Sequence, residues 1–173
     1  MDTDGVVAPS RSPAPASTFE AFFDQEYARL ARALFLVTGD GAESEDLAQE
    51  AMARVYERWD RVSQMSFPVG YLYRTSFNLN RKRLRRLGVR RRRDAMVATD
   101  PADPAMVTQA RFEIRAALAS LPRGQREALV LREWIGLGSA EAASVLGVSA
   151  GTVRARVSRA KSAIRQRYGG SDE

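Results

Sequence analysis

The chain has 173 residues, no cysteine and no histidine, and a formal net charge of +6 with a pI near 10.3. This composition excludes disulfides, thiolate chemistry and Cys/His zinc sites, and it lacks the commonest general acid–base residue. A basic chain favours an anionic partner such as nucleic acid or an acidic membrane surface. No run approaches about 18 apolar residues and the N-terminus lacks signal-peptide features, so we expect no membrane span and a cytoplasmic location.

The first part of the chain predicts a tail followed by two helices. Residues 1–17 are rich in Pro, Ala and Ser, which is typical of a disordered tail. Apolar residues recur at helical spacing from Phe19 to Val37, and the glycines of TGDG (38–41) then end the helix. A second helix is predicted from an N-cap at Ser44 to Val62. Its apolar stripe consists of Leu47, Ala51, Val55 and Trp59.

The second predicted helix is acidic on one side. Asp46, Gln49 and Glu50 fall on one surface, away from the apolar stripe. Such a surface would repel DNA and would suit a basic protein partner. An ordinary solvated helix face is the alternative interpretation.

A third predicted helix has the opposite character. Residues 63–70 (SQMSFPVG) predict a loop, and the helix begins again at Tyr71, with basic residues outward and Leu72, Thr75, Leu79 and Leu84 inward. Aromatics and asparagines alternate here with arginines, a pattern that suits single-stranded or melted nucleic acid: Tyr71, Tyr73, Phe77, Asn78 and Asn80. Burial in the core is the alternative for Tyr71 and Phe77.

A basic run and a linker separate the two halves of the chain. The run RKRLRRLGVRRRR (81–93) holds nine of the 27 basic residues. Residues 94–107 contain prolines and aspartates without an apolar period, which indicates a flexible linker between residues 18–93 and 108–168. Helices are expected over 108–120, 124–135, 139–146 and 150–167, with a short tail at 169–173. The predicted fold is all-α, in two small domains with thin cores.

The last two predicted helices have the pattern of a helix-turn-helix. Ser139 is expected to cap the first helix, Gly147 to take a left-handed turn, and Ser149 to cap the second. The second helix has an apolar stripe of Val153, Val157, Ala160 and Ile164. Its opposite face combines small residues with basic ones, which suits a helix in the DNA major groove. A solvated basic helix is the alternative.

Three segments together resemble extracytoplasmic-function sigma factors, the small promoter-recognition subunits of bacterial RNA polymerase. ESEDLAQEAMARVYERWDRV is similar to their region 2.1–2.2, and YLYRTSFNLNRKRLRR to region 2.3–2.4. SLPRGQREALVLREWIGLGSAEAASVLGVSAGTVRARVSRAK resembles region 4. The resemblance covers about residues 19–167. Two positions depart from it: Tyr71 stands where Trp is common, and Ala142 where Ile is usual.

The resemblance implies three sets of site residues. The core-polymerase docking set, on the β′ clamp, is Asp46, Gln49 and Glu50. The −10 set, which includes the base-capturing loop at 60–70, is Phe67, Tyr71, Asn78, Arg81, Arg85 and Arg86. The −35 set is Ser149, Gly151, Thr152, Arg154, Ala155, Ser158, Arg159 and Lys161. The start of the basic run would hold phosphates near the melted strand. Arg90–Arg93 would follow upstream DNA or a polymerase channel, or form a solvated tether.

The implied function is that of a non-enzymatic subunit that binds core RNA polymerase and promoter DNA and helps to melt the −10 region, with no cofactor. Family members are often held by an anti-sigma factor. A free-standing helix-turn-helix regulator and an arginine-rich RNA-binding protein are the alternatives. An enzyme is the weakest alternative, because the sequence has no phosphate loop, metal cluster or nucleophile–base pair.

Overall fold

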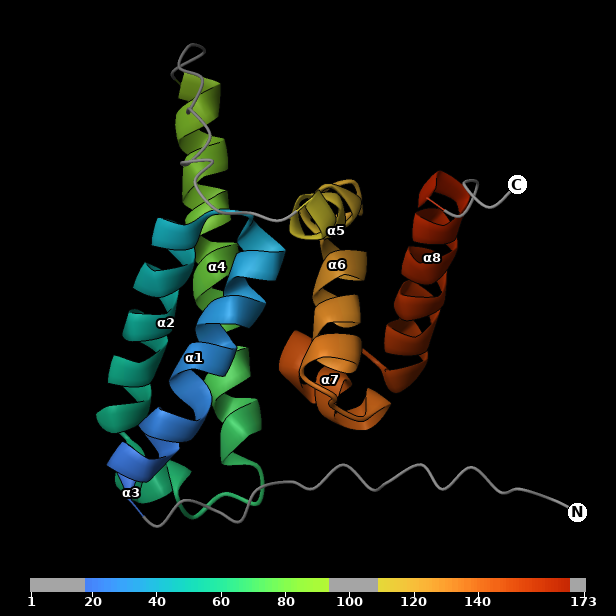
Figure 1. Cartoon of the computed structure of the whole chain (residues 1–173). Helices are drawn as coiled ribbons and strands as arrows, with labels where there is room; N and C mark the ends of the chain where they lie inside the picture. Colours follow the sequence, from blue (N-terminus) through green and yellow to red (C-terminus); the bar gives the residue numbers. More distant parts are fainter. Residues whose placement is uncertain (1–17, 94–108, 169–173) are drawn as a thin grey trace, which may run out of the picture.

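The computed structural model describes residues 18–93 and 109–168, and the side chains of 18–88 and 113–168. Within these ranges the chain is helical and has no strand, which confirms the all-α prediction. Helices α1–α4 form an N-terminal half and α5–α8 a C-terminal half, and the two halves pack against each other (Figure 1). The predicted tails and the 94–107 linker lie outside the described residues.

Helices α1 (Phe19–Thr38) and α2 (Gly41–Tyr56) pack side by side. Gly39 ends α1 with a φ of 77°, as the glycine break predicted. The predicted cap at Ser44 is wrong. Asp40 caps α2 by accepting a 2.9 Å hydrogen bond from the Glu43 amide, and Ser44 is buried inside the helix. Helix α2 begins earlier because Asp40 directly follows the turn at Gly39 and reaches the free amides first.

The second predicted helix does not run unbroken to Val62. It ends at Tyr56, Arg58 leaves the helical conformation, and a short helix α3 follows (Trp59–Val62). The break turns Trp59 towards α1, where its ring lies 5.7 Å from that of Phe19 and 5.2 Å from that of Phe22. Aromatic packing against α1 therefore outweighs the continuation of the helix.

Helix α4 (Pro68–Arg93) is the long helix of the N-terminal half. It begins before the predicted Tyr71, because proline is well suited to the first turn of a helix. Leu72 and Leu79 are buried as predicted, whereas Leu84 is exposed. The prediction fails at Leu84 because the C-terminal part of α4 extends beyond the helices that pack against it (Figure 1).

The C-terminal half consists of short helices. They are α5 (Gln109–Ala119), α6 (Arg123–Leu129), a π-helical turn η1 (Val130–Trp134), α7 (Ser139–Leu146) and α8 (Ala150–Tyr168). Gly147 has a φ of 68° between α7 and α8, and the Ser149 hydroxyl accepts a 3.1 Å hydrogen bond from the Thr152 amide. Both observations confirm the helix-turn-helix prediction.

The predicted cap of α7 is displaced by one residue. Gly138, not Ser139, is the N-cap residue, and its amide donates to the Glu141 carboxylate over 2.6 Å. The apolar stripe of α8 is confirmed: Val153, Val157 and Ala160 are buried, and Ile164 is half-buried. In the described part of the chain, no helix is long and apolar enough to cross a membrane.

Candidate protein and nucleic-acid interfaces

The predicted docking residues lie on the outer face of α2. Asp46, Gln49 and Glu50 are exposed, while Leu47 and Ala51 on the opposite side are buried. Glu50 forms a 2.7 Å ion pair with Arg54, one turn along the same exposed surface. The structure therefore groups the three predicted residues on one accessible, mainly acidic surface.

The predicted base-capturing loop leads into the first turn of α4. The Phe67 ring folds over Gly70: a Cβ atom added at Gly70 would lie 2.1 Å from the Cδ1 atom of that ring. The Tyr71 hydroxyl accepts a 3.1 Å hydrogen bond from Arg58, which precedes α3. Phe67 and Tyr71 are both half-buried, so each offers part of its ring to solvent.

The aromatic and polar residues of α4 that were predicted to face nucleic acid are partly exposed and partly buried. Asn78, Arg85 and Arg86 are exposed. Tyr73, Phe77 and Asn80 are almost completely buried. For Phe77 this is the alternative interpretation, and for Tyr73 and Asn80 the expectation that they face nucleic acid is wrong. The reason is that α4 packs against α2 on one side and α7 on another, so it has two buried faces.

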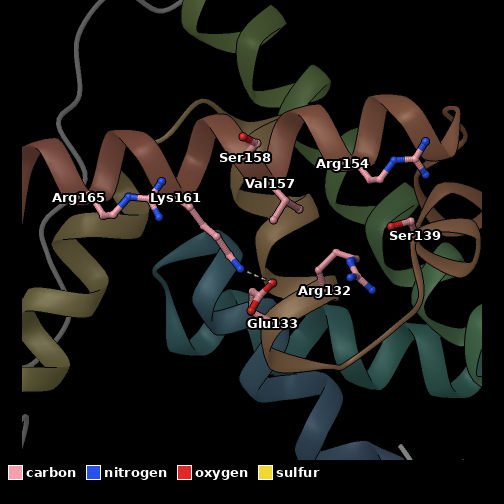
Figure 2. Close-up of a pocket in the computed structure, with 8 residues that line it drawn as sticks. All are labelled: Arg132, Glu133, Ser139, Arg154, Val157, Ser158, Lys161 and Arg165. Atoms are coloured by element: carbon pink, nitrogen blue, oxygen red, sulfur yellow. Dashed lines mark ion pairs between the residues drawn. The ribbon is translucent and has the colours of Figure 1, made fainter. Parts of the chain in front are cut away.

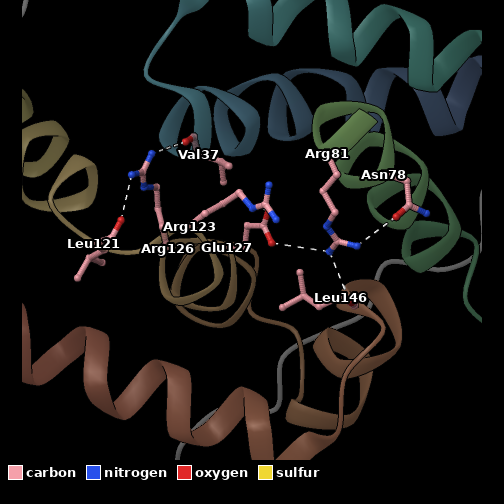
Figure 3. Close-up of polar contacts among 8 residues, drawn as sticks. All are labelled: Val37, Asn78, Arg81, Leu121, Arg123, Arg126, Glu127 and Leu146. Atoms are coloured by element: carbon pink, nitrogen blue, oxygen red, sulfur yellow. Dashed lines mark hydrogen bonds and ion pairs between the residues drawn. The ribbon is translucent and has the colours of Figure 1, made fainter. Parts of the chain in front are cut away.

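Arg81 is the predicted −10 residue with the least expected surroundings. Its guanidinium lies 3.2 Å from the Asn78 Oδ1, donates to the Leu146 carbonyl over 3.3 Å, and forms a 3.7 Å ion pair with Glu127 (Figure 3). Leu146 and Glu127 belong to the C-terminal half. Arg81 therefore contacts protein where the prediction placed DNA.

Glu127 is a buried carboxylate surrounded by arginines. Arg123 pairs with it over 3.6 Å, in addition to Arg81. Burial raises the pKa of Glu127, and the positive charges of Arg81, Arg123 and Arg156 act in the opposite direction. Arg156 comes from α8, so this carboxylate connects the predicted −10 helix, α6 and the predicted −35 helix.

The predicted −35 residues lie along the outer side of α8. Ser149, Gly151, Arg154, Ser158, Arg159 and Lys161 are exposed, and Thr152 and Ala155 are half-buried. A shallow cavity of about 330 Å³ follows this side of the helix; it is lined by Arg154, Ser158, Lys161 and Arg165 together with residues of η1 and α7 (Figure 2). The arrangement is an exposed helix with a basic groove beside it.

Five residues that line this groove were not predicted as site residues: Arg132, Glu133, Ser139, Val157 and Arg165. Glu133 pairs with Lys161 over 2.9 Å, so it holds one of the predicted DNA-binding cations (Figure 2). Arg132 donates to the Leu137 carbonyl. Of these residues, only Arg165 could have been found from the sequence, because it follows Lys161 by one turn on the same predicted helix. Arg132 and Glu133 lie on η1, which directly continues α6, and α6 packs against α8.

Comparison with known proteins identifies the family. A family model of Sigma-70 region 2 matches residues 22–91, and one of Sigma-70 region 4 matches residues 111–164. The ECF RNA polymerase sigma factor SigE of Mycolicibacterium smegmatis is 32% identical over 179 residues, which cover 92% of this chain and 69% of that protein. The chain belongs to the extracytoplasmic-function sigma factors. It directs promoter recognition by RNA polymerase, and its family consists of non-enzymatic initiation factors.

Other relatives of this sigma factor agree with that assignment. The RNA polymerase sigma-E factor of Streptomyces coelicolor is 30% identical over 149 residues, covering 86% of this chain and 84% of that protein. The fold resembles that of RpoE from Bartonella quintana, which was crystallised with the anti-sigma factor NepR. The TM-score is 0.75 at 23% identity, over 89% of this chain and 98% of that one.

Proposed function

We propose that this sigma factor uses three separate surfaces. The exposed face of α2 with Asp46, Gln49 and Glu50 docks on the core polymerase. The start of α4 and its exposed polar residues hold the melted −10 strand. The outer side of α8 with its basic groove binds the −35 duplex. In this division, residues 18–93 and 108–168 are the two functional domains, and residues 94–107 connect them.

One observation supports this division most strongly: the charge on the exposed helix faces. The α2 face presents Asp46 and Glu50, which would repel DNA and attract a basic protein surface. The exposed face of α8 presents Arg154, Arg159 and Lys161 among small residues, which would allow the helix to approach base edges closely. Opposite charge on two separate faces indicates two different classes of partner.

At the −10 element, exposed groups lie along α4, from the loop before its first turn to Arg86. Phe67 and Tyr71 offer partly exposed rings to an unstacked base, and Arg85 and Arg86 offer cations to the phosphates. Captured bases would offset the free energy of unstacking, so binding would favour the melted strand. Polymerase, promoter DNA and this chain would meet in the cytoplasm, where an anti-sigma factor could also bind it.

The roles can be separated by selection from a promoter library. The chain is combined with bacterial core polymerase, a library randomised over the −35 and −10 positions is transcribed, and the templates of the transcripts are sequenced. Arg154→Ala should weaken discrimination at one −35 position by about 1–3 kcal/mol and leave the −10 preference unchanged. Arg85→Ala should lower transcription from all templates without changing the −35 preference. Loss of both preferences in the Arg154 variant would contradict the assignment.

A further inference from the structure

One side-chain hydrogen bond closes the base of the segment that carries Phe67. The Arg58 guanidinium donates to the Tyr71 hydroxyl over 3.1 Å, across 13 positions of the sequence. Arg58 directly precedes α3 and Tyr71 lies in the first turn of α4, so the bond spans α3 and the loop that follows it. Figure 1 shows α3 at the end of the N-terminal half where α1 and α4 begin.

The backbone at both ends of this bond is held by further hydrogen bonds. The Arg58 amide donates to the Val55 carbonyl over 3.1 Å, and the Arg58 carbonyl accepts a 2.9 Å bond from the Val62 amide. The Tyr71 carbonyl accepts a 2.8 Å bond from the Thr75 hydroxyl. Both side chains therefore leave from an ordered backbone, so little conformational freedom is lost when a ligand binds to them.

The partner of Arg58 leaves the positive charge of its guanidinium uncompensated. Arg58 is exposed, and so are the carboxylates of Glu57 and Asp60, which lie close to it in the sequence. Within the described ranges neither carboxylate forms an ion pair with Arg58, and the neutral Tyr71 hydroxyl is the single hydrogen-bond partner of its side chain. A guanidinium has five N–H donors, so the others stay available to an anion.

A tyrosine at position 71 makes this bond possible. Tryptophan is common at this position in the family, and its indole N–H donates hydrogen bonds but accepts none. An arginine could therefore not donate to it, whereas the Tyr71 hydroxyl accepts the bond from Arg58. The departure from the family pattern at position 71 thus coincides with a polar contact that the usual residue could not make.

The other cations assigned to the −10 strand are distant from the partly exposed rings or are occupied. Arg85 and Arg86 lie about 20 Å further along α4 than Tyr71, at 1.5 Å per residue. Arg81 is occupied by groups of the C-terminal half. Arg58, in contrast, contacts Tyr71 directly, so it places a cation next to a half-buried ring.

We propose that Arg58 binds a backbone phosphate of the melted −10 strand, beside the base that Phe67 and Tyr71 capture. The Tyr71 hydroxyl is a positioning group, because it holds the guanidinium next to the ring without neutralising its charge. A charge-assisted hydrogen bond to a phosphate oxygen is about twice as strong as a neutral one. The inference rests on the proposed −10 function of this surface and adds the residue that fixes the strand beside the captured base.

The test uses holoenzyme assembled from the full chain and bacterial core polymerase. Its probe is a fluorescent single-stranded oligodeoxynucleotide that carries the non-template −10 sequence obtained from the promoter selection. Arg58→Gln should weaken binding of this probe about tenfold, as expected for the loss of a hydrogen bond between charged groups. It should also reduce the steepness of log affinity against log salt by about 0.7, the value for one phosphate of a single strand.

Two further variants serve as controls for charge. Arg32→Gln removes one positive charge from an exposed position on α1 and should leave the affinity and the salt dependence almost unchanged. Arg58→Lys keeps the charge and should restore most of the salt dependence that Arg58→Gln loses. Equal losses in the Arg32 and Arg58 variants would show an effect of net charge and would overturn the contact.

Methylphosphonate substitution identifies the phosphate. Each linkage of the probe is replaced in turn by a neutral methylphosphonate, which removes one negative charge. At one linkage this should weaken binding by the unmodified holoenzyme several-fold and leave the Arg58→Gln holoenzyme almost unchanged, because that contact is already lost. Tyr71→Phe, which keeps the ring and removes only the hydroxyl, should give a smaller loss at the same linkage. Coupling of Arg58 to no linkage would overturn the proposal.

Phe67→Leu separates this inference from the −10 function on which it rests, because it removes the ring and keeps an apolar side chain. Weaker probe binding in both the Phe67 and the Arg58 variants supports the proposal. Weaker binding in the Phe67 variant alone would retain the −10 surface and overturn the role of Arg58. Unchanged binding in both variants would overturn the −10 function of this surface and the inference with it.

Discussion

At the scale of single residues, the most informative positions are charged or aromatic groups with unexpected surroundings. Arg81 was expected on a solvent face and instead binds a carboxylate and a carbonyl of the other half. Tyr73 and Phe77 were candidates for base stacking and are buried. The sequence could not show this, because residues of a helix that packs on two sides do not follow a single apolar stripe.

Glu26 gives a prediction about pH. It is 2% exposed in the core of the N-terminal half, its Oε2 has no hydrogen-bond partner in the described residues, and burial raises its pKa against the opposing charge of Arg29. Because folding raises the pKa of Glu26, this residue contributes fully to the free energy of unfolding at pH values below the ordinary pKa of 4.5. That contribution is lost as the pH rises through the pKa of the folded state.

Glu26→Gln should therefore raise the free energy of unfolding at neutral pH by about 1 kcal/mol, since it removes the buried charge. The gain should vanish once the pH falls below 4.5, where the native carboxyl is neutral in both states. Thermal melts of both chains across this pH range provide the measurement. A gain that does not change with pH would show that the carboxylate is not the cause.

Gly70 gives a prediction about the −10 loop. An alanine Cβ at this position would collide with the Phe67 ring, whose Cδ1 and Cε1 atoms would lie 2.1 and 2.3 Å away. Gly70→Ala should displace Phe67 and reduce permanganate reactivity of −10 thymines in open complexes, while polymerase binding is retained. Gly41→Ala is the matched control, because an added Cβ there meets nothing within 4 Å. Equal melting by the two variants would contradict a role for the Phe67 position.

At the scale of helices, the sequence predicted which segments are helical and which helix faces are exposed better than it predicted where each helix begins and ends. The helix break at Gly39, the left-handed turn at Gly147 and the cap at Ser149 were identified correctly, because each is a local backbone requirement, whereas the left-handed Gly136 was missed. The start of α2 and the break after Tyr56 were missed. The start of α2 depends on whether Asp40 or Ser44 caps the helix. The break after Tyr56 depends on the contact of Trp59 with α1, which is distant in the sequence.

The groove beside α8 gives a prediction at this scale. Glu133 holds Lys161 at 2.9 Å and so competes with phosphate for that cation. Glu133→Gln should strengthen binding of −35 duplex DNA at low salt and steepen the salt dependence of binding by about one unit of log–log slope. Binding isotherms at several salt concentrations measure both effects. An unchanged slope would mean that Lys161 already binds phosphate in the unmodified chain, or never reaches it.

At the scale of the whole molecule, the sequence indicated two units but not their contact. The linker and the change of charge along the chain identify two halves, whereas an arginine that donates to a carbonyl of a distant helix end leaves no sequence pattern. The exposed faces of α2 and α8 were predictable because each is the polar side of one amphipathic helix. The contact between the halves required the coordinates of both halves together.

The central claim is that the acidic face of α2 brings this sigma factor to polymerase, and co-elution with bacterial core polymerase on a sizing column tests it most directly. The unmodified chain should co-elute stoichiometrically. The double variant Asp46→Arg, Glu50→Arg should elute separately with unchanged circular dichroism, because reversed charge would repel a basic partner surface. Reversal at Glu20 and Asp24, which are exposed on α1, makes the same change in net charge and should leave co-elution intact. Co-elution of the α2 variant would contradict the account.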